Sequence, residues 1–316
     1  MHTAIPAVLT RGLTKTFGGN RGIISLDLNV ERGEIFGFIG PNGAGKSTTM
    51  RILMDHIRPT DGDAAIFGLD CHRDPVAIHA RVGYLPGDLQ LFERLTGADL
   101  LDWFGCVRGG HDRRYVEHLA ARLALDLSRR VGELSTGNRQ KIGIVQAFMH
   151  RPELLILDEP SAGLDPVVRR ELHDLLEEVR DEGSAVLLSS HVLGEVDQIC
   201  DRVGTIVDGR LRRIDTVAEL RALSRRNMQL IYTGRITVEE VAAIPGVSNV
   251  SATYLDDLGE TVVTLEMSGR VDPILKHASN YEIRDLTSTP ISLANVFLET
   301  YDNRQSDTAA TKRPSP

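Results

Sequence analysis

A glycine-rich stretch, GPNGAGKST at positions 40–48, carries the residues with the most specific chemistry in this sequence. It fits the spacing G-x-x-x-x-G-K-[ST], with a strand-like run, GEIFGFIG, before it and a helix-like run, TTMRILMDHI, after it. Glycines let backbone N–H groups turn inward around an anion, and the start of a helix adds unpaired N–H donors. We therefore predict a phosphate-binding loop made of Gly40, Pro41, Asn42, Gly43, Ala44, Gly45, Lys46, Ser47 and Thr48.

Side chains of the predicted loop and two carboxylates elsewhere in the sequence suit the binding and hydrolysis of a nucleotide. In the predicted loop, Lys46 would reach the β- and γ-phosphates of a nucleotide and the Ser47 hydroxyl would ligate Mg²⁺. An apolar strand ending in two acidic residues, LLILDE at 154–159, would place Asp158 on Mg²⁺ through water and Glu159 on the attacking water as its base. An exposed acidic turn is the alternative, and the loop upstream disfavours it. These motifs alone leave kinases, GTPases and motor-type ATPases open.

Three more segments offer groups for a nucleotide. Ser135 and Gly137, in LSTGNRQ, lie at the start of a predicted helix and could present hydroxyl and N–H donors to a phosphate. His191 ends the strand-like run SAVLLSSH and could hydrogen-bond a γ-phosphate. Phe17, in LTKTFGG, could stack on adenine. Taken singly, each has an ordinary alternative: a helix N-cap, a solvated histidine and an aromatic that packs a turn.

Taken together, these motifs resemble those of the ABC ATPases. LSTGNRQ at 134–140 is similar to the family signature, SAGLDP at 161–166 to its D-loop, SSH at 189–191 to its switch histidine, and Phe17 to its A-loop aromatic. Order and spacing agree over residues 9–211. The resemblance implies ATP and Mg²⁺ as cofactors and a head-to-tail dimer. Each ATP would lie between residues 40–48 of one subunit and residues 135–137 of a second copy or a second cassette.

A looser resemblance points to the ATP-binding subunits of ABC-2-type exporters, the daunorubicin-resistance-like group. It is carried by YLPGDLQLFERLTGADLL and by a late SLANVFLE. It implies a separate membrane permease that docks near the Q-loop and the helical subdomain. Cargo contacts would then belong to the permease.

The sequence departs from the family pattern in two motifs. Gly87 and Asp88 follow YLP, where a glutamine is expected in the Q-loop. Glycine has no side chain for Mg²⁺ or the attacking water, so either Asp88 substitutes or the interaction is lost. The signature has Thr136 and Asn138 where glycine and glutamine are commoner, and both keep a small or polar character.

Composition narrows the partners. The 316 residues are 41% apolar and 25% charged, which is ordinary for a globular protein, and the net charge of −8 without a basic block gives a nucleic-acid partner little support. The apolar runs LLIL and AVLL are too short to span a bilayer, and the first residues lack the apolar core of a signal peptide. We expect a cytoplasmic subunit held at the inner face of the membrane by its permease. The cysteines Cys71, Cys106 and Cys200 form no C-x-x-C pair and are expected to be reduced and mostly buried.

The order of apolar runs predicts an α/β fold, a P-loop NTPase cassette over residues 1–224 with a covered parallel sheet and a helical subdomain at about 89–131. AIHARVGYLPGD is expected to be a strand, and PVVRRELHDLLEEVR a helix capped by Asp165 with a stripe of Leu172, Leu175, Leu176 and Val179. Residues 225–303 predict a small α+β domain of order βαββαβ, a ferredoxin-like arrangement, with a capping box at Thr237 and Glu240. SLANVFLETY is expected to be a closing helix, and 304–316 a disordered tail.

The function predicted from these residues is an ATPase that drives export through a separate permease. One alternative is a non-transport ABC ATPase that uses ATP as a clamp or regulator. A second is a phosphate-loop kinase or GTPase, which would leave LSTG unexplained and for which no N-K-x-D is present. A third gives the main function to the C-terminal domain, with the cassette as its switch.

Overall fold

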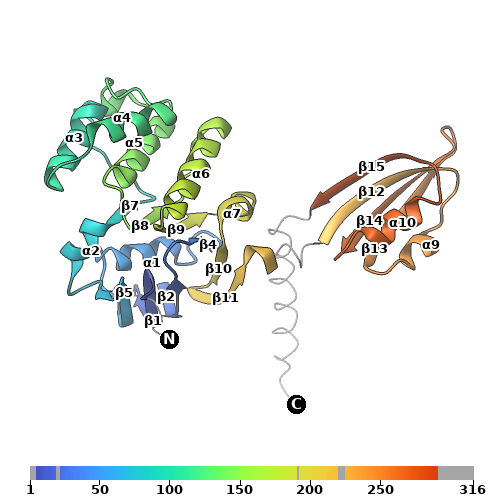
Figure 1. Ribbon diagram of the computed structural model, residues 1–316. Helices are drawn as coiled ribbons and strands as arrows, with labels where there is room; N and C mark the ends of the chain where they lie inside the picture. The colour runs from blue at the N-terminus through green and yellow to red at the C-terminus, as the bar shows by residue number, and fades with distance from the viewer. Residues whose placement is uncertain (1–4, 19–21, 191, 220–224, 291–316) are drawn as a thin grey trace, which may run out of the picture. The chain divides into compact units, whose positions relative to one another are not determined.

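The computed structural model describes residues 5–18, 22–190, 192–219 and 225–290, and the chain divides into two compact units, Met1–Val217 and Ala218–Pro316 (Figure 1). His191, the predicted closing helix SLANVFLETY and the predicted tail 304–316 lie outside the described residues. Within the described part, none of the helices is both long enough and apolar enough to cross a membrane.

The first unit is built on a six-stranded sheet in the order β11-β10-β4-β9-β8-β7. All neighbouring strands run parallel except β11, which pairs antiparallel with β10. Every residue of β4, β8 and β9 is buried, as expected where helices cover both faces, so the prediction of a covered parallel sheet is confirmed. The strands are β4 (Ile35–Ile39), β7 (Val82–Leu85), β8 (Leu154–Asp158), β9 (Ala185–Ser190), β10 (Arg202–Val207) and β11 (Arg210–Thr216).

A second, antiparallel sheet packs beside the first, and the sequence pattern did not predict it. Its five strands are β1 (Val8–Thr16), β2 (Gly22–Leu26), β3 (Asn29–Val30), β5 (Asp61–Ile66) and β6 (Leu69–Asp70). β1 pairs with β2, β3 and β5. Side chains from both sheets, among them Val8, Leu13, Phe36 and Ile156, belong to one buried core.

Helices α1 (Lys46–Leu53) and α6 (Pro166–Asp181) support the central strands, and α7 (Leu193–Ile199) packs beside β9. Asp165 caps α6 by accepting hydrogen bonds from the N–H groups of Val167 and Val168, both at 3.0 Å, so the predicted cap is confirmed. The predicted stripe of Leu172, Leu175, Leu176 and Val179 is buried.

The helical subdomain contains α3 (Gly97–Val107) and α4 (Arg113–Arg122), as predicted, and both pack against α5 (Thr136–Phe148). Thr96 caps α3 and Asp112 caps α4. A 3₁₀ turn, η1 (Val131–Glu133), leads into α5.

The predicted strand AIHARVGYLPGD is wrong in its first half. AIHAR belongs to helix α2 (Pro75–Arg81), and only the following residues form β7. Pro75 occupies the first turn, where its fixed φ and missing N–H suit a helix. With Ile78 as its one buried residue, α2 is too short to show helical periodicity.

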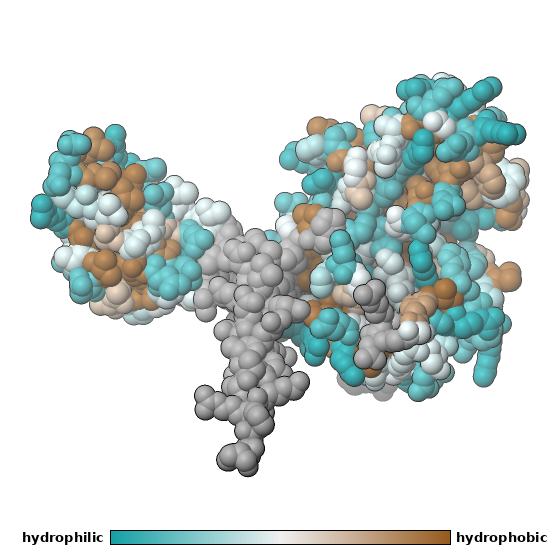
Figure 2. Space-filling model, turned by 180° about the vertical axis from the view of Figure 1, so that it is seen from behind, coloured by the Kyte–Doolittle hydropathy of each residue, from teal (hydrophilic) through white to brown (hydrophobic). Residues whose placement is uncertain are grey.

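The second unit has the predicted ferredoxin-like order. Its elements are β12 (Arg225–Thr233), α9 (Val238–Ala242), β13 (Val247–Leu255), β14 (Glu260–Ser268), α10 (Asp272–Ala278) and β15 (Ile283–Pro290). The sheet order is β13-β14-β12-β15, and all pairs are antiparallel. The predicted capping box at Thr237 and Glu240 is present at the start of α9. Val241 of α9 and Ile274 of α10 belong to one buried core with Leu230 and Val263 of the sheet. Outside its core, each unit shows a mixed hydrophilic and apolar surface (Figure 2).

Candidate nucleotide-binding site

The phosphate-binding loop joins the end of β4 to the start of α1, at the carboxyl edge of the parallel sheet. Gly43 and Gly45 have φ values of 79° and 116°, which side-chain-bearing residues rarely adopt. A Cβ atom on Gly40 would lie 2.1 Å from the carbonyl oxygen of Ile206, and one on Gly45 would lie 2.5 Å from Ile23. Gly40 is therefore required by close approach to the backbone of β10, Gly43 by its positive φ, and Gly45 by both its positive φ and its contact with Ile23 of β2.

Lys46 is the first residue of α1 and is 6% exposed. Its Nζ donates a hydrogen bond to the carbonyl oxygen of Gly40 at 2.7 Å and lies 3.9 Å from Glu159 Oε1. Burial lowers the pKa of Lys46, while the nearby carboxylates of Glu159 and Asp158 oppose that shift. Ser47 and Thr48 follow on the first turn of α1 and are partly exposed. The ammonium group of Lys46 thus lies between the carbonyl oxygens of its own loop and the acidic end of β8.

Asp158 and Glu159 stand at the end of β8 and contact the neighbouring strand β9. Asp158 is 3% exposed, and its Oδ1 accepts a hydrogen bond of 2.6 Å from the hydroxyl of Ser189. The N–H of Glu159 donates to the same hydroxyl at 2.9 Å. Glu159 has a φ of 51°, in the left-handed region. Sequence reasoning did not assign a role to Ser189, although a hydroxyl residue in the apolar strand AVLLSS was a signal for one.

The Q-loop approaches Asp158 through Gly87. A Cβ atom on Gly87 would lie 2.9 Å from Asp158 Oδ2, so the loop backbone lies beside that carboxylate. Asp88 forms an ion pair with Arg51 on α1, at 2.9 Å, and its side chain is 64% exposed. The two residues that replace the expected glutamine thus lie in different surroundings.

The signature segment lies at the start of α5. Ser135 caps this helix by accepting a hydrogen bond of 3.3 Å from the N–H of Asn138, and Ser135 and Thr136 are exposed. A Cβ atom on Gly137 would lie 2.5 Å from the carbonyl oxygen of Gly163, so the signature packs on the D-loop backbone to backbone. The departures at Thr136 and Asn138 therefore leave the cap intact, because the bond from Asn138 uses its main chain.

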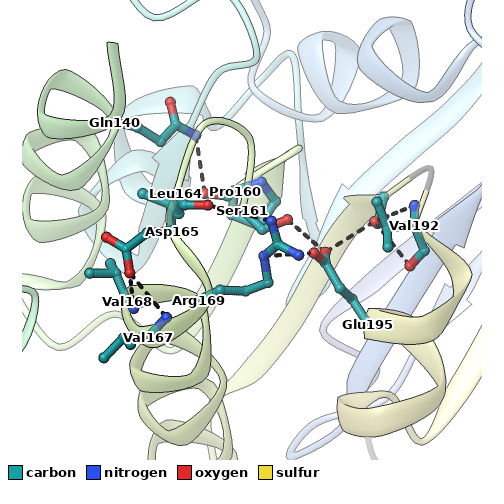
Figure 3. A network of polar contacts seen from close by, with 11 residues as sticks. Gln140, Pro160, Ser161, Leu164, Asp165, Val167, Val168, Arg169, Val192 and Glu195 are labelled. Atoms are coloured by element: carbon teal, nitrogen blue, oxygen red, sulfur yellow. Dashed lines mark hydrogen bonds and ion pairs between the residues drawn. The ribbon is translucent and has the colours of Figure 1, made fainter. Parts of the chain in front are cut away.

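Side chains from two helices anchor the D-loop and the two residues before it (Figure 3). Gln140 of α5 donates from Nε2 to the carbonyl oxygens of Glu159 and Pro160, at 3.3 and 3.2 Å. Glu195 of α7 is 7% exposed, accepts 2.6 Å from the Ser161 hydroxyl and pairs with Arg169 at 3.1 Å. Gln140 and Glu195 were not singled out from the sequence, since only the fold shows that they contact the D-loop or the residues before it.

Phe17 directly follows β1 and is 50% exposed, with Lys15 Nζ 5.2 Å from its ring centroid. The structure thus brings Lys46, Asp158 and Glu159 together. Ser135 and Gly137 lie with the D-loop at the start of α5.

The oxygen donors of the site suit Mg²⁺. Ser47 and Asp158 offer a hydroxyl and a carboxylate, and the Oδ2 of Asp158 faces a loop residue without a side chain. The described residues hold no group of three or more His, Cys, Asp or Glu able to form a metal cage. Mg²⁺ is commonly bound by one or two protein oxygens together with water and substrate phosphates, so this donor set fits it.

The chain is similar in sequence and fold to known proteins. The family model for the ABC transporter matches residues 23–162. The chain is 37% identical over 221 residues to the daunorubicin/doxorubicin resistance ATP-binding protein of Streptomyces peucetius, covering 68% of this chain and 67% of that protein. It is 31% identical over 301 residues to a fluoroquinolones export ATP-binding protein of Mycobacterium tuberculosis, covering 92% of each. A solved ATP-binding subunit of an ABC transporter matches with a TM-score of 0.63 and 29% identity, over 68% of this chain and 92% of that one.

The chain belongs to the family of ABC transporter ATP-binding proteins, and its first unit has the cassette fold of that family.

Proposed function

We propose that this chain is the ATP-hydrolysing subunit of an ABC exporter and drives a separate membrane permease through ATP-dependent closure of a cassette dimer. The observation that carries the proposal is the meeting of Lys46 with Asp158 and Glu159 at the carboxyl edge of the parallel sheet. The similarity to exporter ATP-binding proteins supports the direction of transport, because one such relative matches 92% of the chain.

The chemistry follows from where each group lies. The N–H groups of residues 42–48, which include the start of α1, surround the β- and γ-phosphates, and Lys46 turns from the Gly40 carbonyl to the phosphate oxygens. Ser47 and Asp158 would hold Mg²⁺, and the bound ion would neutralise charge on the phosphates. Glu159 accepts a proton from the attacking water. Phe17 stacks on adenine and His191 contacts the γ-phosphate.

The second half of each site comes from a partner cassette, either a second copy or a related chain. Ser135 caps α5 and is exposed, so its hydroxyl and the N–H groups of residues 135–137 can face a phosphate of the partner's nucleotide. Closure on ATP and reopening after hydrolysis move the helical subdomains, and the permease follows this motion. The subunit works at the cytoplasmic face of the membrane.

Lys46→Ala tests the ATPase assignment. We expect the variant to lose about 10²-fold or more of Mg-ATP hydrolysis, because it lacks the cation that stabilises charge on the transferred phosphate. Lys276→Ala removes a lysine from α10 in the second unit and serves as the matched control. Turnover at the wild-type level in Lys46→Ala would refute the assignment.

The exporter assignment needs a membrane partner. We expect the chain to co-purify with a multi-span membrane protein encoded beside it, and drug efflux from cells that express both to require Lys46. Efflux that is equal with Lys46→Ala would contradict coupling to transport, whatever the ATPase assay shows.

A further inference from the structure

Ser189 lies on β9, beside the two acidic residues at the end of β8. It is 0% exposed and follows four apolar residues on β9. Its hydroxyl lies 2.6 Å from Asp158 Oδ1 and 2.9 Å from the main-chain nitrogen of Glu159. One buried hydroxyl therefore contacts both acidic residues of the predicted hydrolytic site.

The direction of these two hydrogen bonds is determined. A hydroxyl has one proton to donate and lone pairs to accept with. The N–H of Glu159 can only donate, so Ser189 accepts there and its own proton goes to Asp158 Oδ1. Burial makes both bonds costly to lose, because no water replaces them.

The donated bond orients the carboxylate of Asp158. Ser189 and Asp158 are register partners on the parallel strands β9 and β8, so the hydroxyl approaches from the side. With Oδ1 bound there, Oδ2 faces Gly87, where a Cβ atom would lie only 2.9 Å away. Ser189 therefore occupies Oδ1, and the absence of a side chain on Gly87 leaves Oδ2 for a metal-bound water.

The accepted bond supports the turn that aims Glu159. Glu159 has a left-handed φ of 51°, a conformation that costs about 1 kcal/mol or more for a residue with a Cβ atom. Its N–H is held by Ser189, and its Oε1 lies 3.9 Å from Lys46 Nζ. The same hydroxyl therefore stabilises the backbone conformation from which the carboxylate of the base extends.

We propose that Ser189 is a positioning residue for ATP hydrolysis, whose single hydroxyl orients the metal-binding carboxylate of Asp158 and the turn that carries the base Glu159. This inference rests on the proposed function. It predicts that loss of the hydroxyl impairs the use of Mg²⁺ and turnover, while metal-free nucleotide binding through residues 40–48 persists.

A matched pair of variants tests the hydroxyl itself. Ser189→Thr and Ser189→Val have nearly the same volume, and only threonine keeps the hydroxyl. We expect Ser189→Val to lower kcat by about 10–10²-fold relative to Ser189→Thr and to raise the Mg²⁺ concentration for half-maximal hydrolysis several-fold. ATP affinity in EDTA should be equal in the two variants. Equal kcat and equal Mg²⁺ requirement would overturn the proposal.

Thr10→Val controls for the loss of any buried hydroxyl. Thr10 is 2% exposed, donates to the Leu26 carbonyl and accepts from the Leu28 N–H, the same pattern in the other sheet. We expect this variant to lose stability without a change in Mg²⁺ requirement. An equal shift in Thr10→Val would assign the effect to general destabilisation and overturn the proposal.

A double-mutant cycle tests whether Ser189 acts on hydrolysis through Glu159. If the hydroxyl acts by aiming the base, removing it in a Glu159→Gln background should cost several-fold less kcat than in the wild type. Fully additive losses would contradict action through Glu159. A wild-type protein that does not hydrolyse Mg-ATP would refute the proposed function instead, so the two failures are distinct.

Discussion

Gly87 and Asp88 stand where the family resemblance leads one to expect a glutamine, and the structure gives them separate surroundings. Gly87 lies against Asp158, where even a Cβ atom would be only 2.9 Å from the carboxylate. Asp88 pairs with Arg51 and is mostly exposed. Exposed ion pairs of this kind contribute about 0–1 kcal/mol to stability, so we expect the Asp88–Arg51 pair to have little effect on the geometry of the site.

We expect Asp88→Ala to change Mg-ATP hydrolysis by less than about 5-fold, which corresponds to the upper limit of about 1 kcal/mol for an exposed pair. Glu159→Gln should lower it by roughly 10²–10⁴-fold, because glutamine cannot accept the proton of the attacking water. Steady-state turnover of both variants beside the wild type measures the difference. Comparable losses would show that Asp88 has taken over the role of the missing glutamine.

Arg122 links the helical subdomain to helix α6 of the core. Arg122, the last residue of α4, pairs with Glu171 and Glu178 of α6, and its Nη2 lies 2.9 Å from Glu178 Oε1. The hydrogen bonds to Glu178 and Glu171 raise the pKa of Arg122, and the bond from Arg122 lowers the pKa of Glu178 below its ordinary value of 4.5. This contact joins the two parts of the cassette across α4 and α6.

Arg122→Met should lower the free energy of unfolding by about 1–2 kcal/mol, since hydrogen bonds to charged groups are lost from a partly buried site. Amides of α4 should exchange faster with deuterium. Because the pKa of Glu178 is lowered in the folded state, its share of the stabilisation is complete above the ordinary glutamate pKa and disappears as the pH falls below it. The difference between variant and wild type should therefore shrink in acid.

Arg113→Met is the control for this prediction, because Arg113 also lies on α4 but pairs with Asp102 through a side chain that is 68% exposed. It should leave exchange in α4 nearly unchanged. Faster exchange of the same size in both variants would mean that α4 responds to the loss of any arginine, and the tie to α6 would be refuted.

For the whole molecule, the proposed mechanism requires two cassettes. Glu159→Gln should form an ATP-dependent dimer, because glutamine keeps the shape of the base while ATP persists, and Lys46, Ser47 and Asp158 are unchanged. Light scattering with and without Mg-ATP measures the mass directly. A variant that remains monomeric at high concentration with ATP bound would argue against a homodimer and leave a different cassette as the partner.

The second unit should be dispensable for nucleotide binding. The residues that we assign to the nucleotide all lie before position 225, and the first compact unit ends at Val217. Deleting residues 225–316 should leave ATP affinity within about 2-fold of the full chain. Loss of binding by a soluble, folded product would show that the second unit supports the site.

Much of the cassette could be predicted from sequence, because its main devices are local. The glycine spacing of residues 40–48 records a backbone that needs positive φ and close approach, and the apolar runs of β4, β8 and β9 record strands buried on both faces. The capping box at Thr237 and the order of strands and helices in the second unit likewise depend on residues that are close together in the sequence.

What only the tertiary structure decided depends on which segments become neighbours. Ser189 meets Asp158 because β9 lies beside β8. Gln140 of α5 reaches the carbonyl oxygens of Glu159 and Pro160, and Glu195 of α7 reaches Ser161. The antiparallel sheet around β1 and the helix in AIHAR also escaped prediction. Hydrogen bonds between residues 19, 31 and 34 positions apart leave no periodic pattern in the sequence, since the partners are selected by strand order and helix packing.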